Sequence, residues 1–263
     1  RLGAMSRNQW FTSDDDSKSV IRPEHQQNSE YQYKKNLVVI FATNMLSDFG
    51  SDLGLSKTPY KLRFFGGESD IYEGVLFPDT TFIEGTISAP IGVSAVETAV
   101  SNGVKRVFVL GLIGAVAESL RLGSIVIPQQ CEREEGTSYH YASGDLPATP
   151  DQSLFADLCQ FLSAADIKYQ VGNTVSTDAP YRQTIATELE WRKKGLVGVD
   201  MEMSAIFTLG RYLNVPTVGL FVVSDAHDLT GDQEWEWDRS IFRDTVKQMT
   251  MQLAQFASNQ VAN

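Results

Sequence analysis

Short apolar runs alternate along this chain with segments whose apolar positions recur at helical spacing, and no other feature restricts the fold as much. Each run is rich in Val, Ile, Leu and Phe, which is typical of a strand buried on both faces of a sheet. Strands are expected at residues 37–41, 106–110, 124–128, 168–175 and 217–223, with a hairpin of strands 75–77 and 81–83, and helices at 94–102, 153–164, 188–194, 203–213 and 241–256. Strands that alternate with helices form a parallel or mixed sheet with helices on both faces. The sequence therefore predicts an α/β fold: a single three-layer domain around a central mixed, twisted sheet.

The first 35 residues differ in composition from the rest of the chain. Residues 1–35 are polar and predict a loosely ordered N-terminal extension. The alternative is an arm that docks on a partner subunit through Trp10 and Phe11. Residues 36–263 contain no linker and no internal repeat, so we expect one domain there.

Charge and composition exclude several classes of partner. The formal net charge of −11 disfavours binding to a nucleic-acid backbone, which needs a positive surface. No apolar run approaches the roughly 20 residues of a membrane-spanning helix. Cys131 and Cys159 are expected to be reduced thiols of a cytoplasmic protein, and no Cys/His cluster has metal-ligand spacing. The expected partner is a small molecule.

Three of the expected strands run into loops that suit a binding site. These loops lie at residues 111–114, 176–178 and 224–225. Because ligands of such sheets gather at the C-terminal ends of the strands, we expect the three loops to border one pocket.

Two carboxylates flank a methionine just before an expected helix, in the run Asp200-Met201-Glu202. Acidic residues suit a helix N-terminus, where the helix dipole favours them. The functional alternative is that Glu202 faces a pocket and accepts hydrogen bonds from a vicinal diol, since a carboxylate has two acceptor oxygens.

A third carboxylate, Asp225, ends the most apolar strand of the chain, directly after Ser224. An aspartate in that place is poorly solvated and can carry a proton near neutrality. The alternative is a cap for the following turn. One binding carboxylate and one acidic carboxylate form a plausible pair for cleaving a glycosidic bond.

The segments 199–205 and 216–225 resemble the signature of the nucleoside phosphorylase family, which includes purine nucleoside phosphorylase, uridine phosphorylase and methylthioadenosine/S-adenosylhomocysteine nucleosidase. The segments 133–141 and 176–182 are similar to family loops, and 85–114 matches the family's layout. The resemblance extends over residues 36–258, is strongest from Ser124 onward, and implies a nucleoside phosphorylase-like fold.

The resemblance also implies roles for single residues. Glu202 would hold the ribose hydroxyls and Met201 would pack against the sugar. Asp225, beside Ser224 in the substrate site, would protonate or hydrogen-bond the departing base. Uridine phosphorylases lack an aspartate in that role, so Asp225 favours purines.

Four further residues are placed in the substrate site by the same resemblance. The backbone at Ile113 and Gly114 would lie along the base, and Tyr181 and Arg182 would lie near the base or the sugar.

The phosphate-binding residues of the family are largely missing. Phosphorylases carry a Gly-Asp-Pro-x-Arg loop after the first strand, whereas residues 42–48 read Ala-Thr-Asn-Met-Leu-Ser-Asp. Two more family positions fall at Val109 and Leu112, whose side chains cannot donate charge-assisted hydrogen bonds. Arg63 lies where some members donate an arginine across a subunit interface; the alternative is a surface arginine on an edge strand.

The group that activates the nucleophile is not identified by the resemblance. Hydrolytic nucleosidases use a glutamate after the first strand, but the nearest residues here are Asn44 and Met45. The remaining candidate bases are Asp48, Glu68, Glu84, Glu135 and His140.

The expected activity is cleavage of the N-glycosidic bond of a nucleoside, with purines favoured. The reaction is expected to be phosphorylase-like, with phosphate as a possible co-substrate and no metal or organic cofactor. The alternatives are a hydrolytic nucleosidase, a non-catalytic nucleoside-binding protein, and an assembly protein on the same scaffold. Because family members are usually dimers or hexamers, the resemblance implies a homo-oligomer.

Overall fold

A computed structural model describes residues 17–26, 30–144, 146–229 and 235–260, so Trp10 and Phe11 lie outside the described residues. The strands are β1 (Asn36–Phe41), β2 (Leu55–Phe64), β3 (Gly67–Gly74), β4 (Thr80–Glu84), β5 (Arg106–Ala115), β6 (Ile125–Glu134), β7 (Gln170–Thr177), β8 (Leu196–Asp200), β9 (Thr217–Ala226) and β10 (Glu236–Trp237). The α-helices are α1 (Met45–Phe49), α2 (Ala89–Ser101), α3 (Gln152–Ala164), α4 (Ile185–Lys193), α5 (Met203–Tyr212) and α6 (Arg239–Asn259). Short 3₁₀ turns lie at Pro23–Gln26, Gly50–Leu53, Thr137–His140 and Pro180–Arg182.

One mixed sheet contains these strands in the order β10-β9-β6-β7-β8-β5-β1-β4-β3-β2. Strands β4, β1, β5 and β9 run parallel to one another. Strand β5 also pairs antiparallel with β8, and β9 pairs antiparallel with β6. Because β6, β7 and β8 connect these two pairings, strands β5, β9, β6, β7 and β8 close into a barrel. The predicted mixed sheet is confirmed.

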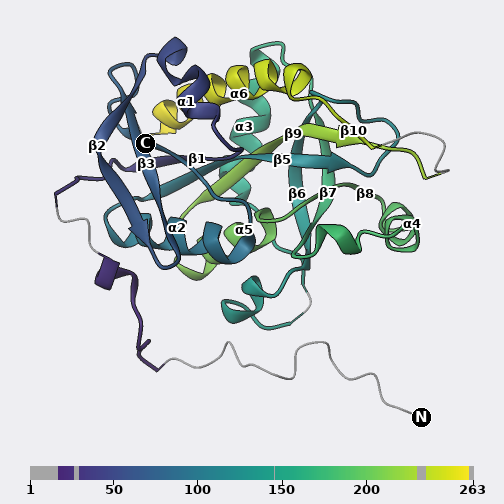
Figure 1. The fold of residues 1–263 in the computed structure, drawn as a ribbon, viewed down its shortest axis with the longest axis horizontal. Coiled ribbons are helices and arrows are strands. Elements are labelled where there is room, and N and C mark those ends of the chain that lie inside the picture. Colours follow the sequence, from purple (N-terminus) through teal and green to yellow (C-terminus); the bar gives the residue numbers. More distant parts are fainter. Residues whose placement is uncertain (1–16, 27–29, 145, 230–234, 261–263) are drawn as a thin grey trace.

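Helices cover both faces of the sheet, as the alternation predicts. Figure 1 shows α1 and α6 along one face and α2 and α5 along the other. Strand β1 is buried throughout, with Val38 and Ile40 packed toward the α1 and α6 side and Val39 and Phe41 toward the α2 and α5 side. The predicted three-layer domain is confirmed.

The hairpin is present, but its first strand is not where the apolar residues predicted it. Strand β3 ends at Gly74, and Ile71 lies opposite Ile83 of β4. Val75 is 94% exposed because it lies in the turn between the two strands. The prediction of a strand at 75–77 was therefore wrong.

The sequence pattern did not predict strands β2 and β3, because polar residues dominate them. They pair antiparallel at the edge of the sheet, where Lys57 and Lys61 contact Asp70 at 2.6 and 2.7 Å. Opposite charges on paired strands support the pairing without an apolar pattern.

The segment before residue 36 contributes to the core. Tyr31 and Tyr33 are 8% and 9% exposed, and their rings meet edge to face with centroids 4.7 Å apart. The Tyr31 hydroxyl donates to Glu73 at 2.7 Å. These contacts place Tyr31 and Tyr33 against the domain. The domain boundary at residue 36 stays a prediction. No helix in the described part of the chain is long and apolar enough to cross a membrane.

Candidate active site

The topology brings three strand ends together. Gly114 of β5 lies opposite Val199 of β8 on one side and opposite Asp225 of β9 on the other. The residues that follow β8 and the end of β9 therefore meet beside β5. A cavity of about 630 Å³ opens there, lined mainly by apolar side chains.

Six of the nine residues predicted for the site line this cavity. They are Gly114, Tyr181, Met201, Glu202, Ser224 and Asp225. The three loops expected to meet all contribute, through Gly114, Thr177 and Ser224. The sheet register explains this convergence, since all three loops end strands of the same barrel.

The other three predicted residues do not line the cavity. Ile113 is 1% exposed and packs against the neighbouring strand β8, where a Cβ added to Gly198 would lie only 2.6 Å from its Cδ1. Arg182 is exposed on the surface. Arg63 is exposed on β2, the outermost strand of the sheet. Within one subunit, Arg63 thus has the position of a surface arginine on an edge strand.

The two carboxylates that flank Met201 have different surroundings. Asp200 accepts the backbone N–H groups of Glu202 and Met203 at 2.9 and 2.7 Å, and the Ser176 hydroxyl at 2.5 Å. Asp200 therefore holds the start of α5. Glu202 lines the cavity and accepts the backbone N–H of Ser88 at 2.8 Å through one oxygen.

Both carboxyls are buried, and burial changes their protonation. Burial raises the pKa of Glu202 well above its ordinary value, and the neighbouring Asp200 raises it further. Burial likewise raises the pKa of Asp200, although the hydrogen bond from Ser176 opposes this shift. The protonated form of each carboxyl is thus stabilised inside the protein.

Ser88 has a backbone conformation that side chains rarely adopt, with φ 139° and ψ 145°. This region of φ and ψ is occupied almost only by glycine. The conformation directs the Ser88 N–H at Glu202. Strain of this kind persists where the surrounding structure imposes it, and it is common at functional sites.

Asp225 is held in place by two donors and by the absence of a side chain at Gly114. The Ser224 hydroxyl donates to one carboxylate oxygen at 2.7 Å, and the Trp235 indole N–H donates to the other at 2.9 Å. A Cβ added to Gly114 would lie 2.9 Å from the second oxygen. Only glycine therefore allows the carboxylate to lie over the β5 backbone.

Aromatic and aliphatic side chains that sequence reasoning missed form much of the cavity wall. Trp235 and Trp237 stack with centroids 5.7 Å apart, and both are partly exposed at the cavity. Phe41, Ile87 and Leu112 line it from β1, the β4–α2 loop and β5. The apolar wall foreseen at Leu112 is present, whereas Val109 is buried in the core.

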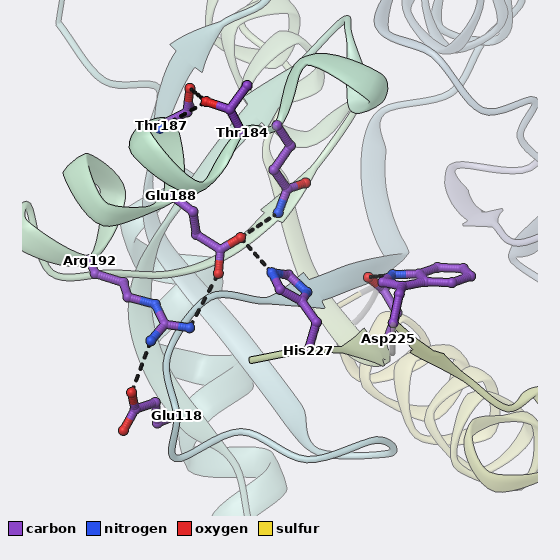
Figure 2. A network of polar contacts seen from close by, with 9 residues as sticks. Glu118, Thr184, Thr187, Glu188, Arg192, Asp225 and His227 are labelled. Atoms are coloured by element: carbon purple, nitrogen blue, oxygen red, sulfur yellow. Dashed lines mark hydrogen bonds and ion pairs between the residues drawn. The ribbon is translucent and has the colours of Figure 1, made fainter. Parts of the chain in front are cut away.

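A polar network that sequence reasoning also missed borders the cavity. Glu188 of α4 is 1% exposed and contacts the His227 ring at 2.6 Å. Gln183 donates to Glu188 at 2.9 Å, and Arg192 extends the network toward Glu118. Figure 2 shows His227 between Glu188 and Asp225. His227 and Gln183 both line the cavity. One sequence feature could have indicated this network: His227 follows the predicted site residue Asp225 by two positions.

The turn after β1 forms a cradle of backbone N–H groups that Glu84 occupies. Asn44 adopts the left-handed conformation, with φ 60°. The N–H groups of Leu46, Asn44 and Ser47 all donate to the Glu84 carboxylate. Burial raises the pKa of Glu84 even though these donors oppose the shift. Successive N–H groups of this kind form an anion-binding cradle, here filled by the chain's own carboxylate.

Neither Glu84 nor the remaining candidate bases are among the residues that line the cavity. Asp48 pairs with Arg239 at 2.5 Å, and Glu68 pairs with Lys61 at 3.2 Å. Glu135 is buried and accepts the Ser204 hydroxyl and the Ser138 N–H, both at 2.8 Å. His140 is exposed. Among the described residues, no group of three or more His, Cys, Asp or Glu side chains is arranged to hold a metal ion.

Residues 59–261 match the sequence profile of the Phosphorylase superfamily, which is more than half of the chain. The chain therefore belongs to the phosphorylase superfamily.

Named relatives and solved structures agree with this membership. The guanosine phosphorylase of Halorubrum lacusprofundi is 29% identical over a match that spans 62% of this chain and 66% of that protein. The crystal structure of purine nucleoside phosphorylase from Toxoplasma gondii in complex with immucillin-H superposes with a TM-score of 0.73 at 18% identity, covering 86% of this chain and 90% of that one. An AMP nucleosidase from Bacteroides thetaiotaomicron gives 0.69 at 17% identity, covering 88% and 89%. The predicted nucleoside phosphorylase-like fold is confirmed.

Proposed function

We propose that this protein cleaves the N-glycosidic bond of a nucleoside, with purine nucleosides as the favoured substrates. The observation that carries the proposal is that Glu202, Met201 and Asp225 line one cavity, although Asp225 is separated from the other two in the sequence. A similar protein is named guanosine phosphorylase, which supports a purine substrate.

Glu202 and Met201 are proposed to bind the sugar. The Glu202 carboxylate accepts the backbone N–H groups of Ser88 and Met201, and its oxygens have further lone pairs for a sugar hydroxyl. A carboxylate oxygen accepts a hydrogen bond from a sugar hydroxyl, and the raised pKa of Glu202 also allows the protonated group to donate one. Met201 supplies an apolar contact beside it.

Asp225 is proposed to stabilise the departing base. The bond between sugar and base breaks through a transition state in which the sugar becomes cationic and the base becomes anionic. A donor held at the base lowers the energy of that state. Two hydrogen bonds and the close Gly114 backbone hold the Asp225 carboxyl in one place, so little reorganisation accompanies the reaction.

Phosphorolysis is the proposed reaction, because the family and its named relatives consist largely of phosphorylases. Hydrolysis is the second candidate, and the Glu84 carboxylate favours it. In the phosphorylases that this chain resembles, the loop after the first strand binds phosphate. Here the N–H groups of the corresponding turn already donate to Glu84. A protein that binds nucleosides without turnover remains the third candidate.

Base release measured by chromatography separates these candidates. Adenosine, inosine, guanosine, methylthioadenosine and uridine are each incubated with and without phosphate. Release only with phosphate supports phosphorolysis, and release in both conditions supports hydrolysis. If no base is released while calorimetry detects nucleoside binding, the protein is a binding protein and the cleavage proposal is wrong.

Three further properties belong to the proposal. The chemistry needs no metal or organic cofactor, because positioned side chains stabilise both the sugar cation and the leaving base. The family resemblance favours a homo-oligomer, a dimer or a hexamer, in which Arg63 would reach a neighbouring subunit. The two free cysteines, Cys131 and Cys159, favour the cytoplasm. Sedimentation tests the oligomeric state, and cell fractionation tests the location in the cytoplasm.

A further inference from the structure

A buried carboxylate that does not line the cavity, Glu135, contacts the first turn of α5. Glu135 is 3% exposed. One carboxylate oxygen accepts the Ser204 hydroxyl of α5, and the other accepts the Ser138 N–H, both at 2.8 Å. Because burial of a carboxylate is unfavourable unless hydrogen bonds satisfy it, these two contacts determine where the Glu135 side chain lies.

The loop of residues 135–142, which begins with Glu135, is fixed from within by a buried arginine. The Arg133 guanidinium donates to the Ser138 hydroxyl at 2.8 Å and to the Ala142 carbonyl at 2.7 Å. Since Ser138 also donates its N–H to Glu135, the loop holds the carboxylate at one position against α5.

A series of buried hydrogen bonds connects Glu135 with Glu202. Ser204, whose hydroxyl donates to Glu135, donates its backbone N–H to the Ser176 hydroxyl at 3.0 Å. The Ser176 hydroxyl donates to Asp200 at 2.5 Å, and Asp200 accepts the Glu202 N–H at 2.9 Å. Ser204 follows Glu202 by only two positions, so an anchor at Ser204 also restrains the backbone that carries the Glu202 side chain.

The same loop also contacts the second helix whose start holds Glu202. The Ser88 N–H, just before α2, donates to the Glu202 carboxylate at 2.8 Å. The Tyr141 hydroxyl of the loop donates to Glu97 of α2 at 2.7 Å. The loop therefore connects α5, through Glu135, with α2, through Tyr141, and both helix starts contact Glu202.

We propose that Glu135 is a positioning residue for Glu202, because its hydrogen bond with Ser204 holds the first turn of α5 where the Glu202 carboxyl meets the sugar hydroxyls of the substrate. Glu135 acts through α5 and does not contact the substrate. This inference rests on the proposed function, since it assumes that Glu202 binds the sugar. Loss of the Glu135 contact should then affect only those substrates whose sugar hydroxyls bind Glu202.

Two substitutions break the contact from its two sides. Glu135→Gln keeps the shape of the side chain but replaces one accepting oxygen with an amide, and Ser204→Ala removes only the donating hydroxyl. Glu134→Gln is the matched control, because it makes the same change one residue earlier, at a partly exposed side chain that lies 3.8 Å from Lys194. Circular dichroism and urea denaturation identify the variants that fold.

A double-mutant cycle with Glu202→Ala tests whether Glu135 acts through Glu202. Glu135→Gln and Ser204→Ala are each expected to lower kcat/KM for inosine by about tenfold, because a buried hydrogen bond to a charged group is lost. In the Glu202→Ala background they should change kcat/KM by less than about twofold, since the group that they position is gone. Glu134→Gln should leave kcat/KM unchanged. Similar losses in both backgrounds, or no loss in the wild-type background, would overturn the proposal.

A second comparison separates the sugar hydroxyls from the rest of the substrate. The probe 2′,3′-dideoxyinosine lacks the two hydroxyls that Glu202 would bind. Glu135→Gln is expected to change the affinity for this probe by less than about twofold, while inosine loses about tenfold in kcat/KM or, if the protein releases no base, in affinity. Affinity is measured as an inhibition constant when the protein cleaves inosine and by calorimetry when it does not.

The outcomes distinguish this inference from the cleavage function. If the protein releases no base but Glu135→Gln selectively weakens the binding of inosine, cleavage fails and the positioning role of Glu135 stands. If inosine is cleaved but Glu135→Gln weakens both nucleosides equally, cleavage stands and the positioning role fails.

Discussion

At the scale of single residues, the proposed chemistry depends on a few cavity side chains whose hydrogen-bond partners hold them in place. Glu202 and Asp225 are both carboxylic acids, but backbone N–H and buried carboxyl groups surround the first, whereas hydroxyl and indole donors hold the second. Groups of the same type in different surroundings take different roles in catalysis. The two are therefore expected to respond differently to substitution.

Glu202→Ala removes the proposed hydrogen bonds to the sugar hydroxyls. Because these bonds are expected to strengthen in the transition state, kcat/KM should fall by roughly a hundredfold or more. Steady-state assays of base release measure the effect. Glu190→Ala, which changes a 65% exposed carboxylate on α4, is the control. A folded Glu202→Ala protein with unchanged kinetics would remove Glu202 from the site.

Asp225→Asn keeps the size of the side chain but replaces the proposed acid with an amide. Release of purine should slow far more than nucleoside binding weakens, because the leaving base is charged only in the transition state. Single-turnover rates and calorimetric dissociation constants give the two effects separately. Equal activity of wild type and variant from about pH 5 to pH 8 would rule out an acid role for Asp225.

At the scale of secondary-structure elements, the site depends on how α2 and α5 begin. Ser88 precedes α2 and its N–H donates to the Glu202 carboxylate, whereas Asp200 precedes α5 and its carboxylate accepts the Glu202 N–H. Loops at helix starts thus position the Glu202 carboxyl, while the helices themselves pack in the core.

The backbone at Ser88 predicts a stabilising substitution. Ser88→Gly removes the cost of a positive φ, which outweighs the entropy that glycine adds to the unfolded chain, so the free energy of unfolding should rise by about 1 kcal/mol. Urea denaturation measures the change. Ser88→Val is the opposing variant, since a β-branched residue is expected to lower stability there. A less stable Ser88→Gly protein would show that the Ser88 side chain has a contact role.

The start of α5 predicts a dependence of stability on pH. Burial raises the pKa of Asp200 to about 6, from about 3.9 in an unfolded chain. The folded state therefore holds this proton more tightly, and the resulting stability is present below about pH 4 and is lost as the pH rises to about 6. Asp200→Asn should lack this loss, so its free energy of unfolding relative to wild type should rise by about 2–3 kcal/mol across that interval.

Urea denaturation at several pH values measures this difference. Because Glu202 lies beside Asp200 and also titrates, the double variant Asp200→Asn/Glu202→Gln provides the reference without either carboxyl. A difference between wild type and variants that stays constant from about pH 4 to pH 7 contradicts the assigned shift.

At the scale of the whole molecule, closure of five strands into a barrel decides where the cavity lies. Strand β5 pairs with both β8 and β9 near its end, which places segments about 25 residues apart in the sequence on either side of Gly114. The other half of the sheet, from β1 to β2, ends at the edge strand β2 and packs against Tyr31 and Tyr33.

Tyr31 tests whether the segment before residue 36 belongs to the folded domain. Tyr31→Ala removes a buried ring and its hydrogen bonds to Glu73 and Thr81, so the free energy of unfolding should fall by about 2–4 kcal/mol. Thermal and urea denaturation measure the loss. Val20→Ala, at a side chain that is 91% exposed, is the control. If both variants match the wild type, the domain begins after Tyr31.

The sequence by itself determined the fold class, most buried strands and two of the carboxylates that line the cavity. Strand burial leaves a local apolar pattern, and Glu202 and Asp225 lie in recognisable segments at strand ends. Strands β2 and β3 and the true hairpin were missed because their pairing rests on charges and on partners distant in the chain.

Only the tertiary structure decided what surrounds the chosen residues. Glu84 fills a cradle 38 residues earlier in the chain, and His227 contacts Glu188 across 39 residues. No local pattern encodes such contacts, because they depend on strand register and barrel closure. In the packed fold, Ile113 is buried in the core and Arg182 is exposed on the surface. Gly114 lies directly against Asp225. Side-chain types are local properties of the sequence, and their distances are properties of the packed fold.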